Sequence, residues 1–224
     1  MYRIAYIFPS RSRPDKFFLT LDNIKFFSDS DNYFVWAKLD LDDETMNNPT
    51  VLEKIKNEYP EVTVKLGLSE GKVHSVNRDC EDLPQCDILI IQSDDIKWTE
   101  VGFDTDIRNA FKKHFPNLDG TVHFPEKHGG ENTIIVSILG VNLYKQLGHL
   151  YHEDYASVYC DNEFTEKTKM MDKYVFINKE IFLHLHPIWN MTAFDDLYRK
   201  NEDQKYYQKD RETYLKRKAN NFGL

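Results

Sequence analysis

An α/β fold, built on a mixed and mainly parallel sheet flanked by helices, is the fold class that the sequence predicts. Short apolar runs typical of buried strands alternate with segments whose apolar residues recur at helical spacing. The order strand–helix–strand repeats over the first ninety residues, and parallel neighbours need such crossover helices. At 224 residues and 41% hydrophobic, the chain is long enough to bury a substantial core.

The first half of the chain predicts four strands separated by three helices. Pro9 ends the first strand and Pro60 closes the second helix, because proline cannot continue either element freely. The strands are expected over 3–8, 32–39, 62–66 and 87–92, and the helices over 15–27, 51–59 and 72–79.

The second half alternates less regularly. A polar, loop-like stretch covers 123–132, and the chain from Phe194 onward is charged, tyrosine-rich and helix-prone. This tail is expected to be either a solvated helix packed on the body by its tyrosines or a handle for an anionic partner. Further helices are expected over 103–114, 142–147 and 161–171, and further strands over 133–139, 173–177 and 181–186.

The composition excludes several classes of protein. Lys+Arg 29 against Asp+Glu 37 gives a net charge of −8, which is not the basic surface of a protein that holds nucleic acid mainly through phosphates. The three cysteines show no Cys-x-x-Cys spacing, which argues against structural zinc and for a reducing compartment, so we expect a cytoplasmic protein. No apolar run approaches the roughly 20 residues of a spanning helix, and no signal peptide is expected.

Acidic and histidine side chains follow the apolar runs in a suggestive order. The run 88–91 leads into Asp94 and Asp95, and Asp161, His184 and His186 come much later. Carboxylates at the end of a strand, combined with imidazoles, suit a divalent cation that holds a phosphorylated ligand. An Asp-Asp pair is otherwise a strand-end cap or a surface turn, and that alternative stays open.

Other candidates lie on loops after the strands. Arg11 and Arg13 follow the first strand, where guanidinium groups can bracket a phosphate, although a solvated basic loop is equally expected. Asp40 ends the second strand and could pair with a ribose or a base, or belong to a plain acidic loop. Lys72 and Asn77 could flank the same ligand or lie on the surface of a helix.

Asp161 and the two histidines are the candidates for the reaction itself. Asp161 could take a proton from a hydroxyl as a general base, or cap the helix that begins there. His184 and His186 are expected on one face of a short strand, since side chains alternate along it, which favours a ligand role over two unrelated core histidines.

The order of these segments resembles the GT-A glycosyltransferases, specifically small family 2-like enzymes of bacterial and phage type. The resemblance covers roughly 3 to 189 and rests on the sequence of motifs rather than on one of them. It implies a GT-A, Rossmann-like fold divided into a nucleotide-sugar-binding half (1–97), an acceptor-binding half (98–190) and a helical basic tail (191–224).

The resemblance also implies roles for individual residues. Asp161 corresponds to the catalytic base, and Asp95 and His186 to ligands of a Mn²⁺ or Mg²⁺ ion, with His184 as the competing histidine. The usual Asp-x-Asp is Ser93-Asp94-Asp95 here, which leaves open whether one or both acids touch the cation. The donor-binding residues would be Pro9, Arg11, Arg13, Asp40, Lys72, Asn77 and Asp94, and the acceptor loop would contain His128, Gly129 and Gly130.

The resulting hypothesis is a metal-dependent glycosyltransferase that moves a hexose from a nucleotide-sugar, expected to be a UDP-sugar, to a hydroxyl with inversion. The acceptor would be a saccharide or a hydroxymethylated base of phage DNA, in the cytoplasm of a bacterium or a phage-infected host. Two alternatives remain: a nucleotidyltransferase acting on a sugar phosphate, whose usual glycine-rich first loop is missing here, and a non-catalytic module that binds nucleotide or nucleic acid.

Overall fold

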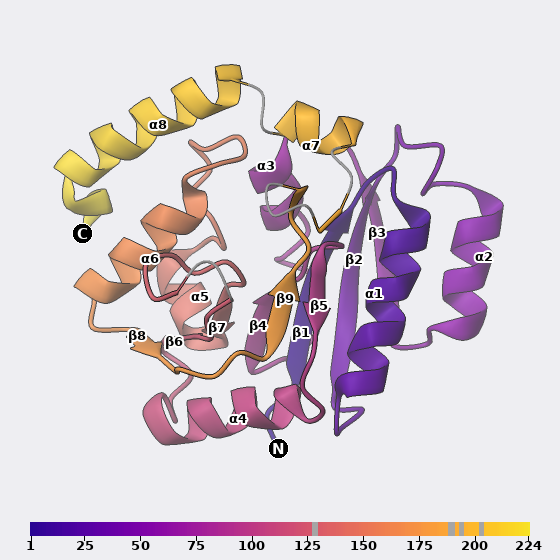
Figure 1. The fold of residues 1–224 in the computed structure, drawn as a ribbon, viewed down its shortest axis with the longest axis horizontal. Coiled ribbons are helices and arrows are strands. Elements are labelled where there is room, and N and C mark those ends of the chain that lie inside the picture. Colours follow the sequence, from indigo (N-terminus) through magenta and orange to yellow (C-terminus); the bar gives the residue numbers. More distant parts are fainter. Residues whose placement is uncertain (127–129, 188–190, 193–194, 202–203) are drawn as a thin grey trace.

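The computed structural model describes residues 1–126, 130–187, 191–192, 195–201 and 204–224, and within them a central sheet is covered by helices on both faces (Figure 1). The strands are β1 (Ile4–Ser10), β2 (Tyr33–Asp40), β3 (Val62–Gly67), β4 (Ile88–Ile91), β5 (Ile96–Trp98), β6 (Thr121–His123), β7 (Ile138–Gly140), β8 (Tyr174–Phe176) and β9 (Phe182–His184). The helices are α1 (Pro14–Phe27), α2 (Pro49–Glu58), α3 (Lys72–Asn77), α4 (Phe103–His114), α5 (Val141–Leu147), α6 (Cys160–Met170), α7 (Asp196–Asn201), α8 (Gln204–Ala219) and the 3₁₀ turn η2 (Asn221–Gly223).

Among the described residues the main sheet has seven strands in the order β3-β2-β1-β4-β7-β6-β8. The first four strands of this order are parallel, β7 is antiparallel to both β4 and β6, and β8 runs parallel to β6. The sheet is therefore mixed and mainly parallel, as predicted. A separate two-stranded sheet pairs β5 with β9, with Ile96 opposite His184.

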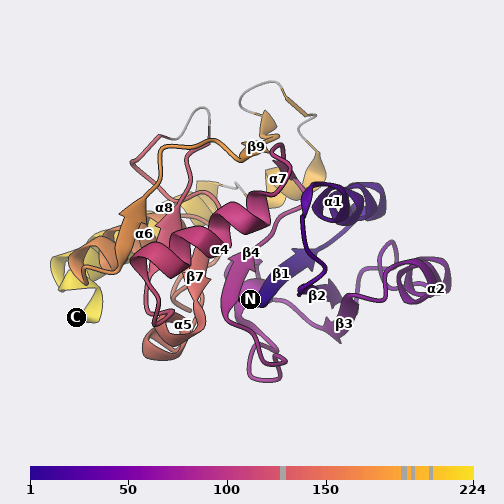
Figure 2. The same cartoon turned by 90° about the horizontal axis from the view of Figure 1, so that it is seen from below.

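Two apolar layers hold the helices to the sheet. On one face, Tyr6 and Phe8 of β1 pack in a buried cluster with residues of α1, α2 and α4, and Phe8 stacks on Phe17 at a ring distance of 4.8 Å. On the other face, Ile7 belongs to a cluster with residues of α3, α5 and α6. Figure 2 shows α1 and α4 on one side of the strands and α5 on the other. Alternation of side chains along each strand produces these two layers.

Several predicted boundaries differ from the structure for clear reasons. Strand β1 continues through Pro9, where the sequence predicted its end. Proline is tolerated there because β4 pairs with β1 only as far as Ile7, so the missing N–H of Pro9 lies beyond the end of β4. The predicted strand 133–139 was too long: only its end joins β7, since the backbone N–H of Ile134 bonds instead to the hydroxyl of Thr165 in α6 (2.9 Å). Strand β5 was missed altogether.

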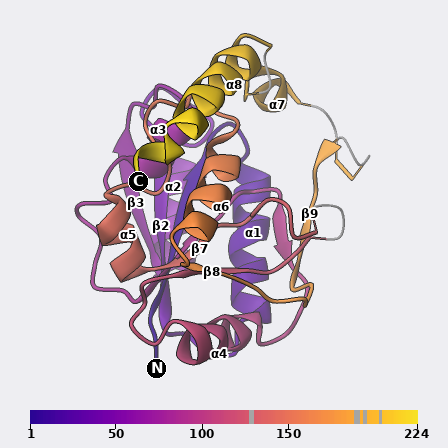
Figure 3. The same cartoon turned by 90° about the vertical axis from the view of Figure 1, so that its left-hand side faces the viewer.

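The tail forms α7 and α8, and α8 packs beside α6 (Figure 3). Phe222, after α8, is 1% exposed and belongs to the body of the protein. None of the described helices combines the length and the apolar character that crossing a membrane requires.

Candidate functional site

The candidate residues gather at the carboxyl edge of the sheet. Arg11 and Arg13 follow β1, Asp40 ends β2, and Asp94 and Asp95 follow β4. Strands β1, β2 and β4 are parallel neighbours, so their carboxyl ends meet at one edge, near the top of Figure 1. From β1 the chain continues to β2 and β3 on one side of β1, and it then crosses to β4 on the other side. The strand order therefore switches between β1 and β4, and ligands of open α/β sheets bind at such a switch point.

An ion pair crosses this switch point. One Nη of Arg13 lies 2.8 Å from Asp94 Oδ1, and both side chains are more than nine-tenths buried. The other side of the Arg13 guanidinium donates two hydrogen bonds to Asp195, of 2.8 Å from Nε and 2.6 Å from Nη2. Burial raises the pKa of Asp94 to about 6; the Arg13 charge opposes this shift and the neighbouring Asp95 charge adds to it. Two acids therefore hold one arginine at the switch point.

Asp95 lies next to an imidazole. It is 8% exposed, accepts a hydrogen bond from the Ser93 hydroxyl, and its Oδ2 is 3.4 Å from Nε2 of His184. The backbone pairing of Ile96 with His184 produces this approach, because it aligns the start of β5 with the end of β9. The His186 ring lies 5.1 Å from the His184 ring, between centroids, although β9 ends before His186.

A buried carboxylate faces the other nitrogen of the same ring. Glu126 Oε2 lies 3.9 Å from His184 Nδ1, the Glu126 side chain is 4% exposed, and this oxygen has no hydrogen-bond partner among the described residues. A carboxylate behind an imidazole is the usual way in which a metal-binding histidine is oriented. Glu126 was missed by the sequence analysis because β6, whose carboxyl end leads into it, was not recognised.

These residues fit a divalent cation that is bound only in part by protein. The donor set of Asp95 and His184, one carboxylate and one imidazole, is of the kind that Mn²⁺ accepts, and Mg²⁺ or Mn²⁺ commonly takes its remaining ligands from water and phosphate. In the part of the chain that the structure describes, no group of three or more His, Cys, Asp or Glu side chains is arranged to enclose a metal by itself.

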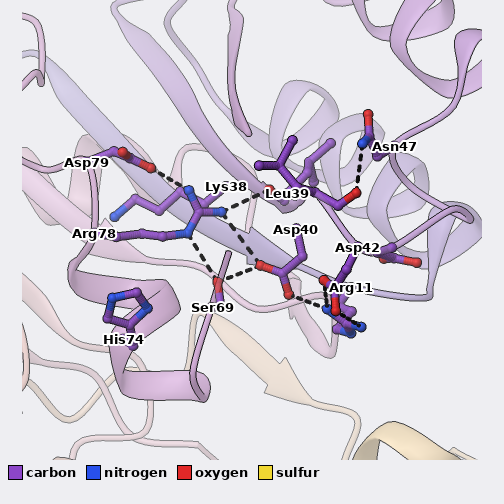
Figure 4. Close-up of polar contacts among 12 residues, drawn as sticks. Arg11, Lys38, Leu39, Asp40, Asp42, Asn47, Ser69, His74, Arg78 and Asp79 are labelled. Atoms are coloured by element: carbon purple, nitrogen blue, oxygen red, sulfur yellow. Dashed lines mark hydrogen bonds and ion pairs between the residues drawn. The ribbon is translucent and has the colours of Figure 1, made fainter. Parts of the chain in front are cut away.

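A second polar cluster surrounds Asp40 at the end of β2 (Figure 4). Asp40 is 5% exposed, its Oδ2 lies 2.8 Å from Arg11, and its Oδ1 accepts a hydrogen bond from Ser69 and lies 3.7 Å from Arg78. Arg78 in turn donates to the Leu39 carbonyl (2.9 Å) and pairs with Asp79. The Asp40 carboxylate is therefore held in one orientation, by Arg11 at one oxygen and by Ser69 and Arg78 at the other.

Asp161 lies in the first turn of α6, one residue after Cys160 and two after the N-cap position, which Tyr159 occupies. Its Oδ1 accepts a hydrogen bond from the backbone N–H of Asn162 (2.9 Å). Burial raises the pKa of the Cys160 thiol to about 12, the Asp161 charge raises it further and the Lys72 charge opposes both. Lys72 begins α3, and the next residue, Val73, bonds to the chain just before α6, so Lys72 and Asp161 lie on neighbouring elements although they are far apart in the sequence.

The amino end of α6 lies on the same side of the sheet as the carboxyl ends of the strands. Helix α3 starts just after β3 at that edge, and the backbone N–H of Val73 donates to the Ala156 carbonyl (3.2 Å), just before α6. Figure 1 shows the upper end of α6 near α3.

Two other predicted groups have different outcomes. The Asn77 amide donates to the Tyr151 carbonyl (2.6 Å) and accepts from the N–H groups of Leu150 and Tyr151 (3.0 and 3.1 Å), so the structure gives it a role in fastening that loop. In the acceptor loop, His128 and Gly129 lie outside the described residues, and Gly130 is exposed with a φ of 55°, which suits glycine.

Comparison with solved structures identifies the fold. A mannosyltransferase from Pyrobaculum calidifontis in complex with GDP-Man and Mn²⁺ matches with a TM-score of 0.63 at 16% identity, over 80% of this chain and 55% of that one. S. aureus TarS 1-349 in complex with UDP-GlcNAc matches with a TM-score of 0.61 at 16% identity, over 81% of this chain and 58% of that one. The chain has a GT-A fold.

The GT-A fold is what these similarities establish. TarS 1-349 in complex with UDP matches over 96% of this chain and 71% of that one, with a TM-score of 0.62 and 16% identity, so the match extends over almost the whole chain. The chain spans somewhat more than half the length of the first two structures. No protein-family profile and no curated protein sequence matches it.

Proposed function

We propose that this protein is a metal-dependent glycosyltransferase that moves a hexose from a nucleoside-diphosphate sugar to an acceptor hydroxyl, with inversion. The observation that carries the proposal is the Arg13–Asp94 pair at the β1/β4 switch point, with Asp95 and His184 beside it and Asp40 at the end of the next strand. Solved structures with this fold hold UDP-GlcNAc, or GDP-Man with Mn²⁺, which supports a nucleotide-sugar as the donor.

The donor would lie along the carboxyl edge. Asp40 presents a fixed carboxylate that can accept hydrogen bonds from ribose hydroxyls or from the N–H of a uracil, both of which a UDP-sugar carries. The diphosphate would reach Arg13, whose planar group can bind phosphate bidentately. A donor phosphate there would compete with Asp94 and Asp195 for the same guanidinium.

Asp95 and His184 would hold the cation, with Glu126 orienting the imidazole and His186 adjacent. When bound, a Mn²⁺ or Mg²⁺ ion stabilises negative charge on the diphosphate leaving group. Asp161 would accept the proton of the acceptor hydroxyl while the oxygen of that hydroxyl bonds to the anomeric carbon, from the face opposite the diphosphate. The bond from that carbon to the phosphate oxygen then breaks, and the nucleoside diphosphate leaves.

The test of the proposal is the exchange Asp161→Asn. General-base catalysis commonly contributes about 10²–10⁴ in rate, so we expect turnover to fall at least about 10²-fold while donor affinity stays within twofold. Glu166→Gln, in the same helix but facing Tyr214 and Lys218, is the control for helix stability. If Asp161→Asn is less stable but its turnover is unchanged, Asp161 stabilises the start of α6 and is not the base.

For the acceptor, we favour a saccharide hydroxyl over a base in DNA. Exposed lysines do line α8, but Lys209 and Lys216 share their groove with Glu153 and Asp154, so the surface is not of one sign. Removing the whole tail is no clean test, because it also removes Asp210 and Phe222, which are buried. Exchanging Lys205, Lys209 and Lys216 for Gln is cleaner: a DNA acceptor requires that this variant binds hydroxymethylated DNA more weakly, with a shallower salt dependence.

A further inference from the structure

The chain that leads into Asp161 is held by residues of other elements. Residues 150–159 contain no regular helix or strand and connect α5 to α6. Their beginning is fastened to Asn77, and Val73 donates to the carbonyl of Ala156. A Cβ added at Gly71 would lie only 2.9 Å from that same carbonyl oxygen. The segment therefore depends on close contacts with its neighbours for its conformation.

Asp210 of α8 contacts this segment just before α6. Its side chain is completely buried, and its carboxylate accepts three hydrogen bonds from consecutive backbone N–H groups: Ala156 at 2.9 Å, Ser157 at 2.8 Å and Val158 at 2.9 Å. A buried carboxylate is costly unless it is hydrogen-bonded, and successive N–H groups that converge on one anion compensate for that cost. Asp210 thus fixes the direction of three peptide units directly before α6.

The residue after these peptides is held in an unusual conformation by the same helix. Tyr159 has φ 62° and ψ −9°, in the left-handed region that non-glycine residues adopt at a cost of about 1 kcal/mol or more. Its ring packs against Tyr214 and Tyr207, both of α8, with centroids 5.5 and 6.0 Å away. These contacts hold Tyr159 at the N-cap position of α6, two residues before Asp161.

Helix α8 is also anchored to α6 on the carboxyl side of Asp210. Arg217 donates two hydrogen bonds to Glu163 in α6, of 2.6 and 2.8 Å, and Tyr214 and Lys218 bond to Glu166. The Glu163 side chain is 4% exposed, so the Arg217–Glu163 pair is largely desolvated and specific in geometry. The C-terminal part of α8 makes these contacts with α6.

We propose that Asp210 is a positioning residue for the reaction: through the 156–158 backbone and Tyr159 it sets the place of Asp161. The C-terminal helix is then part of the catalytic centre rather than a separable handle. This inference rests on the proposed role of Asp161 as the base. It assigns Asp210 no contact with either substrate.

The test is a double-mutant cycle of Asp210→Asn and Asp161→Asn. An asparagine keeps the shape of the side chain but turns an N–H₂ group toward one of the three backbone donors. We expect Asp210→Asn to lower kcat about 10-fold or more with an unchanged donor KM, and to have no further effect when Asp161 is already asparagine. Glu212→Gln, an exchange of an exposed side chain on the same helix, should leave kcat within twofold.

Hydrogen exchange separates this inference from the proposed function. Asp210→Asn should speed exchange of the 156–158 amides whether or not the protein is a glycosyltransferase. If the wild type transfers no sugar, the proposed function fails and Asp210 is left with a structural role only. If the wild type is active and Asp210→Asn reduces kcat equally in both backgrounds, or not at all at a temperature where it is fully folded, the positioning role is wrong.

Discussion

Neutralising Asp40 should weaken both the fold and nucleotide binding, by amounts that the structure allows us to estimate. The Asp40 side chain is 7% exposed and balances Arg11 and the equally buried Arg78. Breaking a buried pair by removing one partner costs about 3–5 kcal/mol. Because Arg78 keeps its pair with Asp79 and asparagine keeps an acceptor oxygen, we expect Asp40→Asn to lower the free energy of unfolding by about 2–3 kcal/mol.

Asp42→Asn is the matched control, since Asp42 pairs with the same Arg11 at 2.6 Å but is 58% exposed. Exposed pairs contribute about 0–1 kcal/mol, so this control should barely alter stability. A hydrogen bond to a charged acceptor is worth about 1.5–3 kcal/mol, so UDP should bind Asp40→Asn about 10- to 100-fold more weakly and Asp42→Asn within twofold of the wild type. Urea unfolding and calorimetric titration with UDP measure both quantities. Equal UDP affinity of the two variants would refute the placement of the nucleoside at Asp40.

Two further predictions concern buried titratable groups. Burial lowers the pKa of His123 from 6.5 to about 4, so the unfolded chain binds a proton before the folded protein does as the pH falls. The free energy of unfolding is therefore at its full value above pH 6.5 and decreases as the pH falls toward 4, by about 3 kcal/mol in total. His123→Asn should flatten the pH dependence of urea unfolding between those values, and an unchanged slope would contradict it. Burial also lowers the pKa of Lys38, whose Nζ donates to the Val76 carbonyl (2.5 Å) and lies 2.9 Å from the Cys80 sulfur. The stability of Lys38→Met relative to the wild type should therefore be highest near pH 7 and should decrease as the pH rises toward 10.5. A difference in free energy of unfolding that stays constant over this range would show that the lysine titrates normally.

The sequence was most informative where local pattern and tertiary packing agree. Helix α4 was predicted with its observed ends, because its apolar residues recur at helical spacing and face the sheet. The parallel strands were found because buried apolar runs alternate with helices. The placement of Arg13 and Asp94 at one edge follows from that topology, but their ion pair depends on side-chain geometry that no spacing encodes.

The missed residues act across long separations in the chain. Asp195 binds Arg13, which is 182 positions away in the sequence, and Asp210 binds Ser157, which is 53 positions away. Neither aspartate belongs to a local pattern that would distinguish it from the other acids of the charged tail. Strand β5 has only three residues, which is too short for an alternating pattern to show. His184 was ranked behind His186 because the pairing of β5 with β9, which brings His184 to Asp95, could not be read from either segment alone.

Release of UDP from UDP-hexoses is the measurement that tests the central claim most directly. The wild-type protein should release UDP with Mn²⁺ present, lose this activity in excess chelator and regain it when Mn²⁺ is restored, because Asp95 and His184 are proposed to hold the cation at the diphosphate. Asp95→Asn should show little UDP release under all three conditions. Full turnover in chelator, or wild-type turnover by Asp95→Asn, would contradict a metal-dependent transfer at the β1/β4 switch point.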